Sequence, residues 1–240
     1  WFCRNVGLAL PLIALQYHEV KFKIEFETKA NCVAGATRGS AVGDITTVND
    51  LTDVNLWVDY IYLDTDERRK FAQLSHEYLI EQLQFTGSEE FKPRLKLNFN
   101  HPCKELIWVG KNNNTGTGLI GEWTKYSNAA GGNPFTNGLL QLNGNDRFAV
   151  RDASYFNLVQ PYQHHTNIPS NKGINVYSFA LKPEEHQPSG TLNMSRIDTA
   201  VLSCGSTTAK KADMEFINVY AVNYNVLRIL SGMGGLAYSN

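Results

Sequence analysis

Apolar and polar residues alternate in several stretches of this chain. Phe22, Ile24 and Phe26 alternate with Lys and Glu, and residues 95–100 repeat the pattern with Lys and Asn. This period of two predicts strands with one buried face and one solvated face. Other runs are apolar on both faces, which is typical of central strands in a sandwich of two sheets. They span residues 56–63, 176–181 and 217–222.

Few segments predict a helix. In residues 64–74, Asp64 or Thr65 would cap the first turn, and the acidic residues that follow favour the helix dipole. A second, shorter helix is predicted over residues 154–159. Asn143-Gly144 follows an apolar run and predicts a tight turn. We therefore expect an all-β protein with short helices and long polar loops.

The order of these elements suggests two β-domains. A proline, an apolar run, a loop and a strand occur in that order after Pro11, and again after Pro188. This weak repeat predicts that residues 1–73 are the C-terminal part of one domain and residues 74–240 a second, complete one. The chain starts at Trp1 without an initiating Met, so we expect it to begin inside a larger polypeptide.

Composition narrows the functional classes. The 240 residues are 42% hydrophobic with a formal net charge of -1, which favours a folded protein over a disordered one. Near-neutral charge argues against a surface that coats nucleic acid. Long apolar runs are missing from the sequence, which argues against a membrane-spanning helix. The four cysteines lie far apart, so we expect free thiols rather than a disulfide framework.

A search for catalytic chemistry yields no candidate. His164 and His165 are adjacent and would point to opposite faces of a strand, although a loop would allow both to reach one ion. Acidic pairs such as Glu184-Glu185 are expected in solvated loops, and a glycosidase pair stays open because distances in space are unknown. We predict no catalytic residue, no cofactor and no metal. Asn-x-Ser/Thr sequons at Asn113 and Asn193 are possible N-glycosylation sites.

Several longer blocks carry a family resemblance. They are GLALPLIALQYHEV at 7–20, WVDYIYLD at 57–64, HEYLIEQLQF at 76–85, DRFA at 146–149, YSFALKP at 177–183, QPSGT at 187–191, SRID at 195–198, NYNVLRI at 223–229 and GMGGLAY at 232–238. Together and in this order, they resemble the major capsid proteins of nucleocytoplasmic large DNA viruses, closest to those of algal viruses such as the chlorella viruses.

This resemblance implies a double jelly roll, which consists of two antiparallel β-sandwiches. The first roll would be incomplete over residues 1–73, and the second complete over residues 74–240. It also implies a structural, non-enzymatic protein of the virion, assembled in the infected host cell. The expected partners are two further copies in a pseudo-hexameric trimer, neighbouring capsomers and minor capsid proteins. An internal viral membrane would lie nearby, with no direct contact to nucleic acid.

Contact residues are expected among exposed Arg and Tyr side chains, which are favoured at interfaces. The candidates for intersubunit or loop-anchoring contacts are Arg147, Arg151, Tyr155, Tyr162 and Arg196. The alternative, that they only fix loops within one chain, stays open. Two other functions also stay open: a non-viral carbohydrate-binding jelly-roll module, and a cupin-like or glycoside-hydrolase enzyme.

Overall fold

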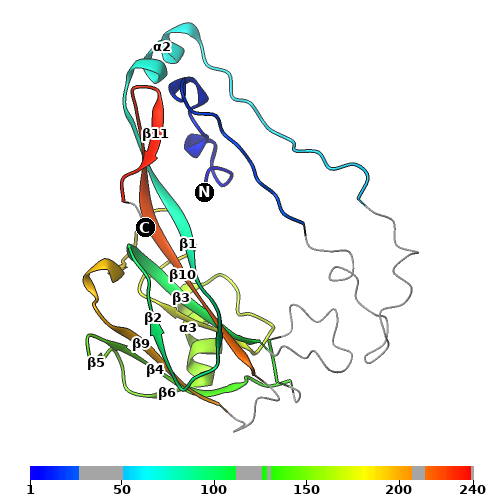
Figure 1. The fold of residues 1–240 in the computed structure, drawn as a ribbon, viewed down its shortest axis with the longest axis vertical. Coiled ribbons are helices and arrows are strands. Elements are labelled where there is room, and N and C mark those ends of the chain that lie inside the picture. Colours follow the sequence, from blue (N-terminus) through cyan, green and yellow to red (C-terminus); the bar gives the residue numbers. More distant parts are fainter. Residues whose placement is uncertain (27–50, 112–125, 129–130, 207–213, 239–240) are drawn as a thin grey trace.

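A computed structural model describes residues 1–26, 51–111, 126–128, 131–206 and 214–238. Its main body is a sandwich of two antiparallel sheets (Figure 1). The first sheet has the order β1-β10-β3-β7, with β11 on β10 and β8 on β3; the strands are β1 (His76–Glu90), β3 (Pro102–Lys111), β7 (Ile174–Ser178), β8 (Leu192–Asn193), β10 (Phe216–Leu230) and β11 (Met233–Leu236). The second has the order β2-β9-β4-β5, with β6 on β4; the strands are β2 (Arg94–Leu97), β4 (Phe135–Leu142), β5 (Asn145–Asp146), β6 (Arg151–Asp152) and β9 (Ala200–Ser206).

The core lies between the two sheets. Leu106 and Trp108 of β3 and Val219 of β10 face Leu140 of β4 and Leu202 of β9, and each of these side chains is buried. Burial of this apolar area is the main force that holds the sheets together. The predicted alternation in β2 is confirmed, because its leucines are buried while its Arg and Lys are exposed.

Short helices flank the sandwich: η1 (Val6–Leu8), η2 (Leu12–Ala14), α2 (Thr65–Gln73), η4 (Tyr155–Val159), α3 (Gln160–His164) and η5 (Met194–Arg196). The predicted cap of α2 is confirmed, since Asp64 Oδ1 accepts a hydrogen bond from Glu67 N at 2.8 Å. The second predicted helix is present and continues to residue 164 as the π-helical turn η4 followed by α3. Within the described residues, no helix is long and apolar enough to cross a membrane.

The predicted tight turn between β4 and β5 is also confirmed. Asn143 and Gly144 both have positive φ, 50° and 82°, as a two-residue hairpin turn with right-handed strand twist requires. Thr199 N donates to Asn143 Oδ1 at 3.0 Å, which fixes this turn to the chain before β9.

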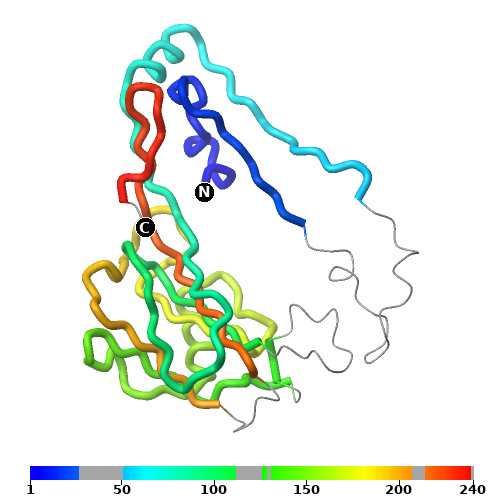
Figure 2. Tube along the Cα trace, viewed as in Figure 1, coloured from blue at the N-terminus to red at the C-terminus, as the bar shows by residue number. Residues whose placement is uncertain are grey.

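Two predicted strands are wrong. Residues 21–26 and 56–63 form no strand, and their apolar side chains are exposed, including 91% of Trp57 and 59% of Phe26. Figures 1 and 2 show both segments as extended traces outside the sandwich. The apolar pattern is typical of a strand, but a strand also needs a hydrogen-bonded neighbour, and neither segment has one among the described residues.

The predicted strand over residues 176–181 is correct only to Ser178. Beyond it, the backbone N–H groups of Phe179 and Ala180 both donate to Lys104 O, at 2.8 and 3.2 Å. This turns the chain away from the sheet and leaves Leu181 71% exposed. The predicted strand over residues 217–222 lies inside β10 and is confirmed.

The N-terminal segment contacts the β10–β11 hairpin. Tyr17 N donates to Gly232 O at 3.0 Å, and Gly234 N donates to His18 Nδ1, also at 3.0 Å. Gly232 has φ 81° in the hairpin turn, and a Cβ there would lie 2.5 Å from the Tyr17 ring. Glycine is therefore required both for the turn and for the close approach of the N-terminal segment.

Candidate interaction surface

A bulge in β3 lies at two adjacent charged residues, Lys104 and Glu105. Val222 of β10 pairs with Glu105, whereas Asn223 pairs with Cys103, so Lys104 is the extra residue. Bulges redirect side chains out of the regular alternation. Lys104 is 1% exposed and Glu105 is 7% exposed, so each needs a partner of opposite charge.

Lys104 contacts one carboxylate, one backbone carbonyl and one aromatic ring. Its Nζ lies 2.6 Å from Glu81 Oε1, donates to Pro183 O at 2.7 Å, and lies 4.9 Å from the centre of the Tyr224 ring. Glu81 also pairs with Arg4 Nη1 at 2.8 Å, and its side chain is 8% exposed. Glu81 therefore joins the N-terminal segment, β1 and β3 through one carboxylate.

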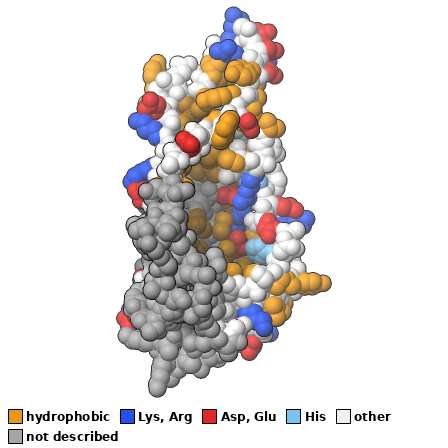
Figure 3. Space-filling view, turned by 90° about the vertical axis from the view of Figure 1, so that its right-hand side faces the viewer, with side chains coloured by type: hydrophobic (Ala, Val, Ile, Leu, Met, Phe, Trp, Pro, Cys, Tyr) orange, Lys and Arg blue, Asp and Glu red, His pale blue; other side chains and the backbone are white. Residues whose placement is uncertain are grey.

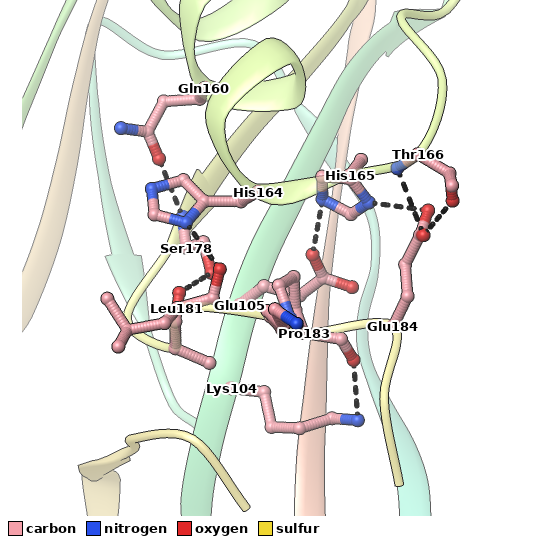
Figure 4. Close-up of polar contacts among 12 residues, drawn as sticks. Lys104, Glu105, Gln160, His164, His165, Thr166, Ser178, Leu181, Pro183 and Glu184 are labelled. Atoms are coloured by element: carbon pink, nitrogen blue, oxygen red, sulfur yellow. Dashed lines mark hydrogen bonds and ion pairs between the residues drawn. The ribbon is translucent and has the colours of Figure 1, made fainter.

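Glu105 pairs with His165, which follows helix α3 (Figure 4). His165 Nε2 lies 2.9 Å from Glu105 Oε2, and Nδ1 lies 3.2 Å from Glu184 Oε1. The Nε2 contact is poorly aligned for a hydrogen bond, so it is mainly an ion pair. The adjacent Glu105 carboxylate raises the pKa of His165, partial burial opposes this, and Glu184 raises it further.

Glu184 is fixed from the other side by Thr166. The backbone N of Thr166 donates to Glu184 Oε2 at 3.0 Å, and its hydroxyl donates to the same oxygen. The Thr166 hydroxyl lowers the pKa of Glu184, and His165 contributes in the same direction. The carboxylate of Glu184 is consequently held in its ionised form between two donors.

These contacts fix residues 181–189, which we name the tethered segment. Besides Lys104 and His165, His164 Nδ1 contacts Leu181 O at 2.9 Å, and Tyr224 hydroxyl donates to His186 O at 3.1 Å. Figure 4 shows this segment passing in front of the first sheet beside Lys104 and Glu105, where hydrogen bonds and ion pairs rather than strand pairing hold it.

An exposed apolar ridge adjoins the tethered segment. Tyr162 of α3 is 77% exposed, Leu158 of η4 is 46% exposed, and Leu181 of the tethered segment is 71% exposed. A second apolar region covers the N-terminal segment and residues 51–64, and Figure 3 shows hydrophobic side chains gathered on the upper half of that face. Exposed apolar patches of this kind mark contact surfaces.

The five predicted contact residues are only partly brought together. The Arg151 guanidinium lies 5.5 Å from the centre of the Tyr155 ring, and Tyr155 hydroxyl accepts from Gln160 Nε2 at 2.9 Å. Tyr162 lies on the exposed ridge, whereas Arg147 and Arg196 are exposed elsewhere, after β5 and in η5. Whether these residues contact another subunit stays a prediction.

Of the two predicted sequons, Asn193 lies in the part of the chain that the structure describes. Asn193 is exposed, and its Oδ1 accepts from Ser195 N at 3.1 Å at the start of η5. Ser195 Oγ in turn accepts from His101 N at 2.9 Å. Asn113 lies outside the described residues.

The histidines and cysteines that the structure describes lie in separate places and contact different groups. His164 ends helix α3 and contacts Leu181 O, whereas His165 follows the helix and contacts two carboxylates. In the part of the chain that the structure describes, no three His, Cys, Asp or Glu side chains converge as metal ligands would. Burial raises the pKa of Cys103 and of Cys204 to about 12, so both thiols stay protonated near neutral pH.

Sequence reasoning missed the ion pairs around Lys104 and Glu105. The signal was present: two adjacent, oppositely charged residues interrupt an otherwise apolar run at residues 103–109. Charges inside a buried strand require partners, so this pair could have indicated a buried network, although not its members.

Comparisons with known proteins agree over the whole chain. The family described as "Large eukaryotic DNA virus major capsid protein" matches residues 67–235, and "Major capsid protein N-terminus" matches residues 1–64. The chain is 54% identical over 263 residues to the major capsid protein of Pyramimonas orientalis virus, covering 100% of this chain and 60% of that protein. It is 44% identical over 294 residues to that of Paramecium bursaria Chlorella virus 1, covering 100% and 65%. The chain thus spans less than two thirds of the length of these relatives.

Solved structures give the same result. The capsid structure of PBCV-1 matches with a TM-score of 0.72 and 38% identity, covering 99% of this chain and 68% of that one. The Faustovirus major capsid protein matches with a TM-score of 0.54 at 13% identity, covering 70% and 36%, which supports the fold alone. The predicted all-β, double jelly-roll class is confirmed. By its sequence and by its fold, this chain belongs to the large eukaryotic DNA virus major capsid protein family.

Proposed function

We propose that this chain is part of the shell-forming protein of an icosahedral large DNA virus and that it assembles as a homotrimer with a pseudo-hexameric outline. The observation that carries this proposal is the match to the PBCV-1 capsid, at 38% identity over 99% of the chain. Residues 1–73 would be the C-terminal part of the first jelly roll, and residues 74–240 the second. The protein would reside in the virion capsid.

The physical properties of the sandwich suit a shell. Two sheets packed over an apolar core give a rigid block, and a net charge of -1 allows many copies to lie side by side without strong repulsion. We propose that the protein catalyses no reaction. Its partners would be itself, neighbouring capsomers and minor capsid proteins, with an internal membrane nearby and no direct nucleic-acid contact.

Tyr162 is the leading candidate for a contact between copies. It is 77% exposed on α3, Leu158 one helical turn before it is also exposed, and Tyr residues are enriched among the residues that dominate interfaces. Arg151 and Tyr155 stack within one chain, so for this pair the loop-anchoring role is the better supported. Arg147 and Arg196 are proposed for the rim of a contact, where exposed charges add specificity more than affinity.

The proposal is tested by measuring the mass and shape of the purified protein. Light scattering after size exclusion should give the mass of three chains, and electron micrographs should show three-fold prisms. Tyr162→Ser should weaken the trimer, whereas Met233→Ser should not, because Met233 is similarly exposed on β11 at the other end of the molecule (Figure 1). A stable monomer that binds glycans on an array would contradict the proposal and favour a carbohydrate-binding module.

A further inference from the structure

Both ring nitrogens of His165 face carboxylate oxygens (Figure 4). Nε2 lies 2.9 Å from Glu105 Oε2, and Nδ1 lies 3.2 Å from Glu184 Oε1. A neutral imidazole has one N–H and one lone pair, so it would turn a lone pair toward one of the two carboxylates. The imidazolium places its positive charge against both carboxylates and carries an N–H on Nδ1 toward Glu184, while its contact with Glu105 is an ion pair.

The two carboxylates belong to different parts of the fold. Glu105 is fixed in the centre of the sheet by β3, and its side chain is 9% exposed. Glu184 lies on the tethered segment, and its side chain is 46% exposed. His165 therefore bridges a rigid strand to a segment that has no strand partner of its own.

We propose that His165 is a proton-operated clamp: its imidazolium helps to hold the tethered segment on β3 by bridging Glu105 to Glu184, and loss of its proton loosens the segment. This inference goes beyond the proposed function and does not depend on it, because every group involved belongs to one chain.

Other ionisable groups nearby are engaged elsewhere. Among the described residues, those near the clamp are Lys104 and Glu105 from β3, Glu81 from β1, Tyr224 from β10, Lys182, Glu184, Glu185 and His186 from the tethered segment, and His164 from α3; Lys182 pairs with Glu185. Lys104 is paired with Glu81, His186 Nδ1 lies 3.8 Å from the same Glu81, and His164 contacts a backbone carbonyl. Of the carboxylates that the structure describes, Glu105 and Glu184 are the two that pair with His165.

The direction of the pH response follows from these contacts. The pKa of His165 is raised in the folded chain, so the clamp is fully closed below the ordinary histidine value of about 6.5 and opens as pH rises through the raised value. The pKa of Glu184 is lowered in the folded chain. The stabilisation that its carboxylate gives to the segment is therefore fully present above the ordinary glutamate value of about 4.3, and it is lost as pH falls through the lowered value. The tethered segment should be held between these limits.

The tethered segment adjoins the exposed ridge at Leu181. Leu181 belongs to the tethered segment, and its carbonyl is bonded to His164, two residues after Tyr162. The proton on His165 therefore adjusts how firmly Glu184 and its neighbours are held, while the contact from His164 keeps the Leu181 carbonyl beside α3.

Hydrogen exchange on the full chain tests the clamp. Peptides covering residues 181–189 are followed from about pH 6 to about pH 9, with each rate divided by its intrinsic rate at that pH. Protection should fall about tenfold for each unit by which the fold raises the pKa of His165, and then level off. A peptide from residues 217–222, inside β10, should show no such step.

Variants identify the titrating group. His165→Gln should remove the step and leave the segment weakly protected at every pH. His164→Gln is the matched control, because it alters the neighbouring histidine and should keep the midpoint. Glu105→Gln should move the midpoint to lower pH more than Glu184→Gln does, since Glu105 is the larger cause of the raised pKa.

Clear outcomes would overturn the proposal. Unchanged protection of residues 181–189 across the range in the unaltered chain would do so, as would a step that survives in His165→Gln or disappears in His164→Gln. If His165→Gln does not fold, the unaltered chain and Glu184→Gln still test the proposal. The midpoint of the protection step must then lie at lower pH in Glu184→Gln than in the unaltered chain.

Discussion

Gly138 of β4 is the position where one methyl group should disturb the core most clearly. A Cβ at this glycine would lie 2.8 Å from Cε2 and 3.2 Å from Cζ of Phe156. Phe156 is 1% exposed, and its ring packs against Trp108, Phe148 and Tyr155 at centroid distances of 5.1, 5.6 and 5.2 Å. The ring is enclosed on these sides, so it has little freedom to move away.

We expect Gly138→Ala to lower the free energy of unfolding by about 1–3 kcal/mol, the usual cost of overpacking a core. In a domain of this size, that corresponds to a fall in Tm of about 2–12 °C. Urea unfolding followed by tryptophan fluorescence measures the change. Gly235→Ala is the control, because nothing lies within 4 Å of a Cβ there, and it should be neutral or slightly stabilising.

A double-mutant cycle checks the cause. Phe156→Leu removes the ring atoms that the new methyl group would meet. It should lower stability in the unaltered chain, and it should lower stability much less in the Gly138→Ala variant. The expected coupling is about 0.5–3 kcal/mol in the favourable direction. Simple additivity of the two changes would refute the steric argument, since it would mean that the methyl group and the ring do not meet.

Three further outcomes are expected. Asp64→Ala should reduce the amide protection of residues 65–73 and cost about 1 kcal/mol of local stability through loss of the cap to Glu67 N, measured by hydrogen exchange; unchanged protection would contradict the capping role. With a pKa of about 12, the thiols of Cys103 and Cys204 should resist iodoacetamide at about pH 8 while exposed Cys3 reacts, as peptide mass spectrometry would show; equal labelling would contradict their burial. Limited proteolysis of the chain should give a resistant fragment that begins near residue 74, because residues 21–26 and 51–63 are extended, exposed and unpaired to any described strand; a protected N-terminal third would contradict this.

Local chemistry made some elements predictable from the sequence. The α2 helix, the Asn143-Gly144 turn and the buried leucines of β2 each depend on residues close to one another in the chain. Residues 56–63 have an equally apolar pattern but form no strand, because strand formation depends on a partner supplied from elsewhere. Apolar periodicity therefore predicted the elements whose partners are present in the described chain and failed where they are absent.

The contacts of His165 could not be predicted from the sequence, because they join residues that are far apart in the chain. On a strand the adjacent histidines would diverge, whereas His164 ends helix α3 and His165, directly after it, contacts Glu105 of β3. The bulge at Lys104 depends on the register between β3 and β10, which shifts between Val222 and Asn223. Asn223 is fully buried, and its Nδ2 donates to Asn100 O at 3.2 Å, so a contact 123 residues away in sequence stabilises the bulge.

Strand β3 explains how one sandwich has both a rigid body and a pH-sensitive surface segment. Leu106 and Trp108 of this strand face the apolar core, where packing density resists any change in volume. Just before them, the bulge directs Lys104 to Pro183 of the tethered segment and Glu105 to His165, so ion pairs and hydrogen bonds replace a packed interior there. Packing energy does not change with pH, whereas the imidazolium contacts do. The tethered segment is therefore able to titrate while the sheet beneath it stays unchanged.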